Sequence, residues 1–468
     1  MLFTFSSRCF GSRNFSLKTP TYGLGRYVIA LYFTQAENAT YLKIMKNLLI
    51  SVIVLFIGCT AIAVHPDSPV EVDNTRVKTG NDEKKTVVLG IENFLKNDLS
   101  LVKGKRVGLV THPSGVNHHI QSTADLLFEN PNVNLTALYA PEHGIRGAIY
   151  AGEKVKSQTD SKTGLPIYSL YGNTRKPTAQ MLKGVDVLLV DLQDVGIRSY
   201  TFIYTMAKVM EAAAEHHKEV IVLDRPNPIG GVAVEGNLVQ PGYFSFVGMY
   251  PIPYRHGMTI GELAKLFNQE YQINSQLTVI PLNNWQRDQS WVDTQLPWVP
   301  TSPHVPHWQS ALLMGATGTI GELDALSVGV GYTLPFEMVG APWIDGEKFA
   351  KALNKLNLPG VIFRPVYFKP YYGKYKGEVC QGVQLHLIDM NTFKPFVTGI
   401  HLMKTTMALY PNHNLFAKRS RLSMFNKVMG SDHILKSLQR GQSVDQIEAA
   451  WQNELNRFKN IRQKYLIY

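Results

Sequence analysis

Five short apolar runs alternate with segments of helical periodicity, and this alternation limits the fold more than any other feature of the chain. The runs span residues 105–111, 134–140, 186–191, 219–224 and 277–282. They are apolar along most of their length rather than at every second position, which is typical of strands buried on both faces of a parallel sheet. We therefore predict an α/β fold, a Rossmann-like doubly wound parallel sheet with helices on both faces.

A different pattern begins after about residue 300. Strand-like runs at 361–369 and 382–389 are followed by helical segments, among them 444–458. A chain of 468 residues with 45% hydrophobic residues is long enough for two domains. The pattern predicts a Rossmann-like domain over 86–300 and a smaller α+β domain over 301–468.

The helix expected at 259–271 carries a start signal. Thr259 stands at its beginning and Glu262 follows three residues later, which is the spacing of a capping box. A hydroxyl and a carboxylate at this spacing satisfy backbone N–H groups that a helix leaves unpaired at its start.

The N-terminal segment has the pattern of a targeting signal. The basic stretch Met45 to Asn47 precedes an apolar run at 48–58, the order found in an export signal. Residues 1–85 are therefore expected to hold an export signal, with Met45 as the true start, and a polar tether. Two processing sites stay open: Cys59 could be lipidated and anchor the protein to a membrane, or an ordinary peptidase could cut after 61–63. Either way we expect an exported protein, periplasmic or membrane-anchored.

Charge and cysteine content argue against several functional classes. The formal net charge is +11, but no dense Lys/Arg run or basic helix occurs, so no nucleic-acid partner is expected. The cysteines Cys9, Cys59 and Cys380 lack the paired spacing of a zinc site or a disulfide framework. The first strand-like run is followed by His112-Pro113-Ser114-Gly115 instead of a Gly-x-Gly-x-x-Gly or phosphate-binding loop. No cofactor is therefore expected.

Polar side chains collect where the predicted strands end. In an open parallel sheet the ligand lies beyond the carboxyl ends of the strands, so these residues are expected to share one edge. Four successive strand ends contribute, which favours a binding cleft over chance. The residues are His112; Glu142, His143 and Arg146; Asp191, Gln193, Asp194 and Arg198; and Asp224, Arg225 and Asn227.

Structural readings remain open for several of these residues. Asp191 could serve in catalysis, or it could cap a helix or brace Arg198. Arg225 could bind substrate or lie in a buried salt bridge. Tyr200 and Tyr204 are four residues apart, so they share a helix face and could pack in the core.

A segment rich in tryptophan and proline at 283–308 follows the fifth run. It contains Ser302 and His304 beside four tryptophans. Aromatic rings near a polar cleft commonly stack on sugars, but a strap between domains with buried tryptophans fits equally well. Glu337, which follows Pro335-Phe336, is a further carboxylate that the second domain could contribute.

The motifs together resemble the exo-β-N-acetylmuramidase (NamZ-type) family, formerly a domain of unknown function. The resemblance extends over about residues 86–468, and several motifs in the same order are more specific than any one alone. They are Tyr139-Ala-Pro-Glu-His-Gly144, Asp191-Leu-Gln-Asp-Val-Gly-Ile-Arg-Ser-Tyr-Thr201, Asp224-Arg-Pro-Asn-Pro228, His256-Gly-Met-Thr-Ile-Gly-Glu262, Thr301-Ser-Pro303 and Phe425-Asn-Lys-Val-Met-Gly-Ser-Asp432.

The resemblance implies a glycoside hydrolase of cell-wall recycling that releases terminal N-acetylmuramic acid from the non-reducing end of peptidoglycan fragments. Such enzymes have a Rossmann-like domain and a smaller domain with the cleft between them. The family's catalytic glutamate is carried over onto Glu142. The implied partners are muropeptides or disaccharides from peptidoglycan.

The hypothetical mechanism follows from what glycoside hydrolysis needs, a proton donor and a group that stabilises the charged sugar. Glu142 would be the general acid, and His143 would orient it or relay its proton. The second group would be Asp191, Asp194 or Glu337, or the substrate's own acetamide. Substrate-binding residues are predicted in addition, with Arg146 or Arg198 on the lactyl carboxylate. The full set is His112, Arg146, Gln193, Arg198, Tyr200, Asp224, Arg225, Asn227, His256, Ser302 and His304.

Two rival functions are kept. One is a metal-dependent cell-wall hydrolase or amidase with ligands from His112, His143, Asp191, Asp194, His304 and His307, although no His-Glu-x-x-His motif occurs. The other is a lipoprotein that binds muropeptides in the same cleft without catalysis. The oligomeric state is left open.

Overall fold

The computed structural model describes residues 86–146, 153 and 158–468. The export signal and tether expected at 1–85 lie outside these residues. The described residues from 86 onward belong to one compact unit. Within them, no helix is long and apolar enough to cross a membrane.

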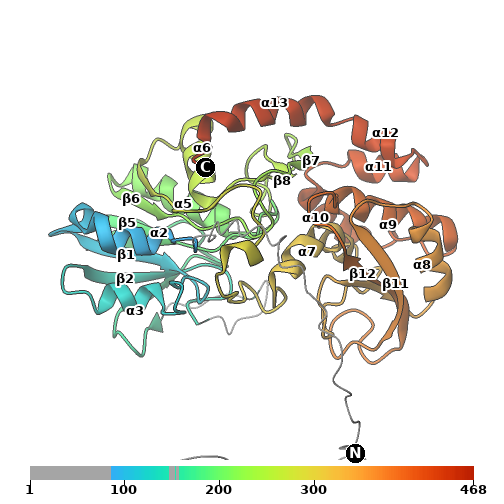
Figure 1. Cartoon of the computed structure of the whole chain (residues 1–468), viewed down its shortest axis with the longest axis horizontal. Coiled ribbons are helices and arrows are strands. Elements are labelled where there is room, and N and C mark those ends of the chain that lie inside the picture. The colour runs from blue at the N-terminus through green and yellow to red at the C-terminus, as the bar shows by residue number, and fades with distance from the viewer. Residues whose placement is uncertain (1–85, 147–152, 154–157) are drawn as a thin grey trace, which may run out of the picture. The chain divides into compact units, whose positions relative to one another are not determined.

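A seven-stranded sheet forms the first part of this unit, in the order β3-β4-β2-β1-β5-β6-β9 (Figure 1). All neighbours are parallel except β3 and β4. Numbered along the chain, the six parallel strands have the order 3-2-1-4-5-6, which is the usual Rossmann order, so the predicted α/β fold is confirmed. The bounds are β1 Arg106–Thr111, β2 Asn134–Ala140, β3 Gln158–Thr159, β4 Pro166–Ser169, β5 Val187–Asp191, β6 Glu219–Leu223 and β9 Gln276–Ile280.

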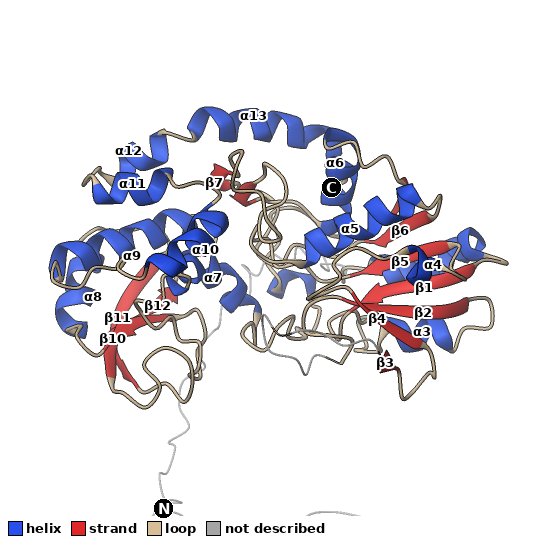
Figure 2. Cartoon of the chain, turned by 180° about the vertical axis from the view of Figure 1, so that it is seen from behind, coloured by secondary structure: helices blue, strands red, loops and turns tan. Residues whose placement is uncertain are grey.

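The central strands are buried on both faces, as their continuous apolar runs predict. Side chains of β5 divide between two hydrophobic clusters: Leu188 and Val190 pack on one face, and Val187 and Leu189 pack on the other. The first face is covered by α5 and α6, and the second by α2 and α3 (Figure 2). These helices are α2 Gly90–Asn93, α3 Thr123–Phe128, α5 Phe202–Glu215 and α6 Ile260–Glu270, with α4 Ala179–Leu182 beside them.

The capping box of α6 is confirmed. The backbone N–H of Glu262 donates to the hydroxyl of Thr259 at 3.2 Å, and the backbone N–H of Thr259 donates to the carboxylate of Glu262 at 3.0 Å. Both groups are buried, so without these contacts α6 would begin with unpaired donors in the protein interior.

The C-terminal portion combines an antiparallel sheet, of order β10-β12-β11, with a group of helices. The helix expected at 444–458 is two helices, because the chain breaks at Trp451, whose buried indole packs on Phe396 with ring centroids 5.7 Å apart. The bounds are α7 Trp308–Gly321, β10 Met338–Ala341, α8 Gly346–Asn354, β11 Val361–Phe368, β12 Cys380–Leu387, α9 Pro395–Leu409, α10 Arg419–Met429, α11 His433–Gln439, α12 Val444–Ala449 and α13 Gln452–Arg462.

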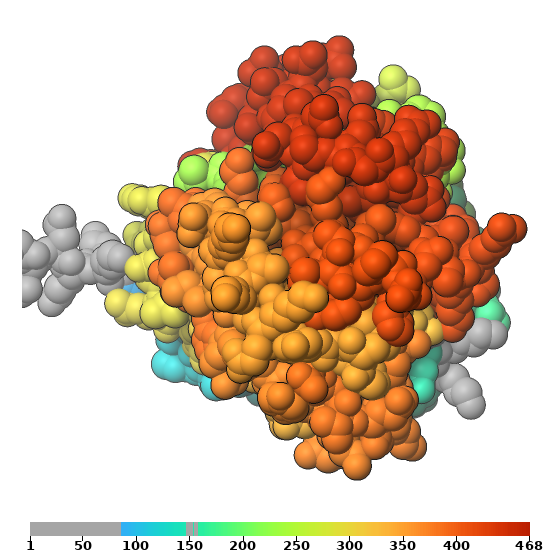
Figure 3. All heavy atoms as spheres, turned by 90° about the vertical axis from the view of Figure 1, so that its right-hand side faces the viewer, coloured from blue at the N-terminus to red at the C-terminus, as the bar shows by residue number. Residues whose placement is uncertain are grey.

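The two portions are joined by shared packing. Buried residues of α5 and α6 belong to the same hydrophobic cluster as those of α7, α9 and β12. Helix α13 runs back toward the first portion (Figure 1), where the hydroxyl of Tyr465 donates to Glu270 of α6 at 2.6 Å. A small ribbon of β7 (Glu235–Leu238) and β8 (Pro253–Arg255) lies between them. Seen from the right-hand side of Figure 1, residues of the C-terminal portion form most of the visible surface (Figure 3).

Candidate active site

A cavity of about 460 Å³ is lined by residues from both portions. The first portion contributes the loops that follow β2, β4 and β5, and the second contributes α7, α10 and the segment around 302–305. Its size lies in the range of roughly 300–1,000 Å³ that is common for small-molecule sites. Five residues predicted from the sequence line it: Glu142, His143, Tyr200, Ser302 and His304.

Glu142 enters the cavity from a turn that directly follows β2. Pro141 ends the strand, and both His143 and Gly144 have left-handed backbone conformations, with φ of 71° and 77°. A histidine in this region costs about 1 kcal/mol or more, and such strain persists where the surroundings enforce it, often at functional sites. The turn places two consecutive polar side chains, Glu142 and His143, on the cavity wall.

Two hydroxyl groups hold the carboxylate of Glu142. Thr201, at the start of α5, donates its hydroxyl to Oε2 at 2.7 Å. The phenol of Tyr171, in the loop after β4, also faces it: burial raises the pKa of Tyr171, and the hydrogen bond and negative charge of Glu142 raise it further. The carboxylate is nearly buried, with 9% of the residue exposed. It is therefore oriented by neighbours on two other strand ends.

Three histidines lie around this turn. The His112 and His143 rings have centroids 6.2 Å apart. Burial, followed by the charge of His143, lowers the pKa of His112 to about 3, and the same two causes lower the pKa of His304. The backbone N–H of Ser114 donates to Nδ1 of His112 at 3.2 Å, so the proton of the neutral ring is on Nε2. His112 is thus a buried, neutral support for the turn.

The segment around 300 closes another side of the cavity. The hydroxyl of Tyr200 donates to the backbone carbonyl of Thr301 at 2.5 Å, which pins this segment to the start of α5. Ser302 and His304 follow on the cavity wall. Nε2 of His304 lies 2.9 Å from the hydroxyl of Tyr372, which connects the wall to the loop after β11.

The C-terminal portion supplies charged groups that the sequence did not indicate. Glu322 ends α7 and Arg421 belongs to α10, and both line the cavity. They form an ion pair at 3.1 Å. Phe336, which also lines it, has a left-handed backbone with φ of 68°.

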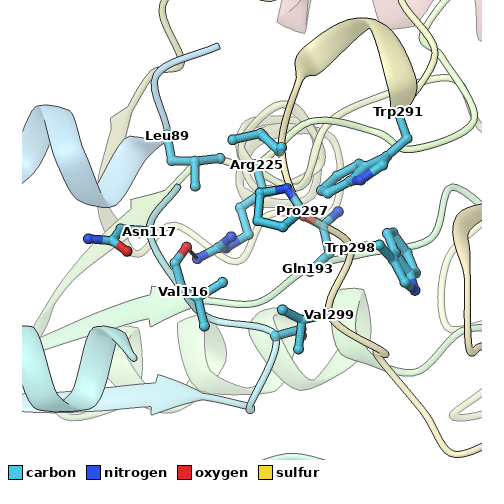
Figure 4. A pocket seen from close by; sticks show the side chains of 11 residues that line it. Leu89, Val116, Asn117, Gln193, Arg225, Trp291, Pro297, Trp298 and Val299 are labelled. Atoms are coloured by element: carbon cyan, nitrogen blue, oxygen red, sulfur yellow. Dashed lines mark hydrogen bonds between the residues drawn. The ribbon is translucent and has the colours of Figure 1, made fainter. Parts of the chain in front are cut away.

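The crevice between β1 and β5, where the strand order reverses, is filled by side chains (Figure 4). Asp191 and Arg225 form a fully buried ion pair there, with both guanidinium contacts within 2.8 Å, and Arg225 also donates to the carbonyl of Val116. Trp291 and Trp298, from the tryptophan-rich segment at 283–308, close the crevice and leave a space of about 10 Å³. This is the place where Rossmann folds commonly bind a nucleotide.

Gln193 lines the same small space. Its side-chain amide donates to the carbonyls of Asp194 and Pro226 at 2.8 and 2.9 Å. Trp285 and Trp291 are buried in the core on this face of the sheet. The tryptophan-rich segment could stack on sugars or form a strap with buried tryptophans. The burial of these two rings favours the strap.

Three further predicted residues, Asp194, His256 and Arg198, lie in the interior. Oδ2 of Asp194 lies 3.2 Å from Nε2 of His256 and accepts from the backbone N–H of Gly196. Arg198 is fully buried and donates to the carbonyls of Asn237, Ile252 and Val428. Burial lowers the pKa of Arg198 to about 10. Because its contacts are backbone carbonyls, this arginine joins β7, β8 and α10.

Asp224 and Asn227 hold the start of α6 and Tyr468 and are not among the described residues that line the cavity. The carboxylate of Asp224 accepts from the hydroxyls of Thr259 and Tyr468 at 2.8 and 2.7 Å. Burial raises the pKa of Asp224 to about 6, while the Tyr468 hydrogen bond acts in the opposite direction. The side-chain amide of Asn227 donates to the carbonyl of Met258 at 3.0 Å.

The remaining predicted residues are Arg146 and Glu337. Arg146 is exposed and pairs with the buried Asp160 at 2.6 Å. Glu337 is held by His307 and by the hydroxyl of Ser310, both at 3.0 Å. Neither is among the described residues that line the cavity.

Sequence reasoning missed Tyr171, Thr201, Glu322 and Arg421. A signal exists for Tyr171, because it follows β4, a strand of four residues that begins with proline and is too short to give a clear apolar run. Thr201 closes a quoted motif but was not given a role. Nothing in the sequence around Glu322 and Arg421 indicates that α7 and α10 meet at this cavity.

The residues proposed as metal ligands do not gather. Within the part of the chain that the structure describes, no three His, Cys, Asp or Glu side chains come close enough to hold a metal ion. His112 and His143 are neighbours, while Asp191 is paired with Arg225 and His307 with Glu337.

Two family profiles match the chain. They are described as exo-β-N-acetylmuramidase NamZ, N-terminal, over residues 107–309, and exo-β-N-acetylmuramidase NamZ, C-terminal, over residues 312–468. The peptidoglycan β-N-acetylmuramidase NamZ of Bacillus subtilis strain 168 is 46% identical over 416 residues, which cover 89% of this chain and 97% of that protein.

Two solved structures from Bacteroides fragilis NCTC 9343 are also similar, and both are DUF1343 family proteins. One is 47% identical with a TM-score of 0.78, and the other is 31% identical with a TM-score of 0.64. In each case the match covers 82% of this chain and 99% of the other.

Proposed function

Since the chain belongs to the exo-β-N-acetylmuramidase NamZ family, we propose that it is an exo-acting glycoside hydrolase of cell-wall recycling. It releases terminal N-acetylmuramic acid from the non-reducing end of peptidoglycan fragments. The observation that carries this proposal is Glu142, a nearly buried carboxylate in a sugar-sized cavity, oriented by Thr201 and Tyr171.

Glu142 acts as the general acid. It protonates the glycosidic oxygen as the bond from that oxygen to C1 of the muramic acid breaks. Thr201 fixes one oxygen of the carboxylate, and the strained turn at His143 fixes the backbone. A carboxyl group held in this way needs no reorganisation before proton transfer, which is why orientation contributes to the rate.

The second group is the substrate's acetamide. Asp191, Asp194 and Glu337, the three carboxylates considered from the sequence, are paired with other residues and are not among the described residues that line the cavity. Glu322 does line it but is paired with Arg421. The acetamide carbonyl oxygen attacks C1 as the leaving oxygen takes the proton of Glu142, which forms a cyclic oxazolinium ion that keeps the amide N–H. The Glu142 carboxylate then takes a proton from water, whose oxygen attacks C1 and reopens the ring with net retention.

The test uses the disaccharide in which N-acetylmuramic acid is linked β-1,4 to N-acetylglucosamine. Proton NMR at early times should show free N-acetylmuramic acid appearing as its β anomer. Absence of cleavage would remove the proposed activity. Early appearance of the α anomer would keep the hydrolase and overturn the role of the acetamide.

We also propose that the protein is exported and that Cys59 is lipidated. Support comes from the basic stretch before the apolar run at 48–58 and from the order Phe56-Ile57-Gly58-Cys59. Mass spectrometry of the protein purified from its own cells should find a diacylglyceryl group on a chain that begins at Cys59. An unmodified mature chain that begins near Val64 would contradict lipidation, and a retained N-terminal segment would contradict export.

A further inference from the structure

Arg421 lines the cavity from the C-terminal portion, whereas Glu142 lines it from the first portion. It is the one Lys or Arg among the described residues that line the cavity. Helix α10, which carries it, begins two residues earlier at Arg419. The other residues that line the cavity have carboxylates, imidazoles or uncharged side chains. We therefore ask which ligand group this guanidinium could bind.

Glu322 holds only one edge of this guanidinium. Nε of Arg421 donates to the backbone carbonyl of Glu322 at 2.9 Å, and Nη2 donates to its carboxylate at 3.1 Å. Within the described residues Nη1 has no hydrogen-bond partner, and 39% of the Arg421 side chain is exposed. The head group is thus anchored and still offers donors to a ligand.

The donors of the guanidinium that Glu322 does not hold suit an anionic ligand. Burial raises the pKa of Glu322, and the positive charge of Arg421 counteracts this. A carboxylate that leaves water needs a charged hydrogen-bond partner, and a guanidinium provides donors in a planar fork that matches it. A neutral sugar has no such requirement.

The proposed substrate has one such group on its sugar. N-acetylmuramic acid differs from N-acetylglucosamine by a lactyl ether at C3, which carries a carboxylate, whereas the reacting bond is at C1. Two separate walls are therefore needed, one for the proton donor and one for the carboxylate. Arg198 is buried on backbone carbonyls, and Arg146 is not among the described residues that line the cavity, so neither arginine considered from the sequence can bind this carboxylate there.

We propose that Arg421, anchored through its Nε to the backbone carbonyl of Glu322, binds the lactyl carboxylate and sets the preference for muramic acid over glucosamine. This inference rests on the proposed function and assigns a specificity-determining role to the C-terminal portion. Binding of this carboxylate adds to both the ground state and the transition state, so it should appear in KM more than in kcat.

The experiment compares two aryl β-glycosides of N-acetylmuramic acid, one with the free lactyl carboxylate and one with the neutral lactyl amide of nearly the same shape. In Arg421→Gln, KM for the carboxylate substrate should rise about 10- to 100-fold, the range of a charge-assisted hydrogen bond. Its kcat should change little, and both constants for the amide should stay near those of the wild type. Arg419→Gln is the matched control, since it removes an exposed positive charge from the same helix.

A second variant covers the case in which Arg421→Gln does not fold. Glu322→Gln removes the internal competitor for the guanidinium, so KM for the carboxylate substrate should fall a few-fold while the amide is unaffected. An unchanged ratio of carboxylate to amide kcat/KM in the folded variants overturns the role of Arg421. Failure of the wild type to cleave either glycoside would instead overturn the proposed function itself.

Discussion

Two carboxylates at the same edge of the sheet, Glu142 and Asp191, have opposite environments. Glu142 follows β2 and lines an open cavity, whereas Asp191 ends β5 and is fully buried against Arg225. Only β1 separates the two strands in the sheet. The difference comes from what covers each strand end, because Trp291 and Trp298 pack over the β1–β5 crevice. A Rossmann sheet thus indicates the edge that carries a site, while the segments packed on that edge decide which strand ends are accessible.

The largest expected effect is on catalysis at the open carboxylate. Glu142→Gln should lower kcat on an aryl β-N-acetylmuramide by up to about 10⁴-fold, because the amide cannot donate a proton to the leaving oxygen. The melting temperature should stay near that of the wild type, since the amide still accepts a hydrogen bond from Thr201. Glu129→Gln, at an exposed glutamate, is the control. Near-normal activity in a folded Glu142→Gln protein would contradict the acid role.

Substitution of the buried carboxylate, Asp191, should lower the stability of the protein rather than its activity. Asp191→Asn removes the charge that compensates Arg225 in the interior, so the free energy of unfolding should fall by about 3–5 kcal/mol. Chemical denaturation measures the loss, and kcat per folded molecule should stay within a few-fold of the wild type. Full stability combined with a loss of activity comparable to that of Glu142→Gln would instead place Asp191 in catalysis.

A smaller and pH-dependent effect is expected at Asp224. Its folded pKa of about 6 lies above the ordinary 3.8, so the unfolded chain loses this proton first and the stabilising contribution of the group declines as pH rises from about 4 to 6. The Tyr468 hydroxyl offsets part of this cost by donating to the ionised carboxylate. Tyr468→Phe should therefore cost about 1–2 kcal/mol of unfolding free energy at pH 7.5 and less at pH 4.5.

Denaturation of both proteins at the two pH values measures this difference. Tyr367→Phe, at a tyrosine that is 62% exposed, should have no effect at either pH. An equal loss at both pH values would show that the Tyr468 hydroxyl contributes through the backbone N–H of Leu282, which donates to it at 2.7 Å, rather than through Asp224.

Local patterns determined the elements and their order. The run at 134–140 coincides with β2, and the capping box at Thr259 begins α6 where the sequence indicates. These predictions succeeded because strand burial and helix capping depend on residues close together in the chain. Glycines at 315, 318 and 321 weaken the helical pattern, yet α7 extends through them to Gly321. Gly399 of α9 lies so close to α7 that a Cβ atom would be 2.3 Å from the carbonyl oxygen of Ala316.

By itself, the sequence determined that polar residues would stand at the carboxyl ends of parallel strands, and it singled out Glu142 as the carboxylate of interest. Only the tertiary structure decided that Asp191 pairs with Arg225 rather than Arg198, and that Arg421 joins the wall of the Glu142 cavity. The physical reason is distance along the chain. A strand end is set by neighbouring residues, but the ion pair and the cavity wall join groups from separate elements, whose contact depends on how the whole core packs.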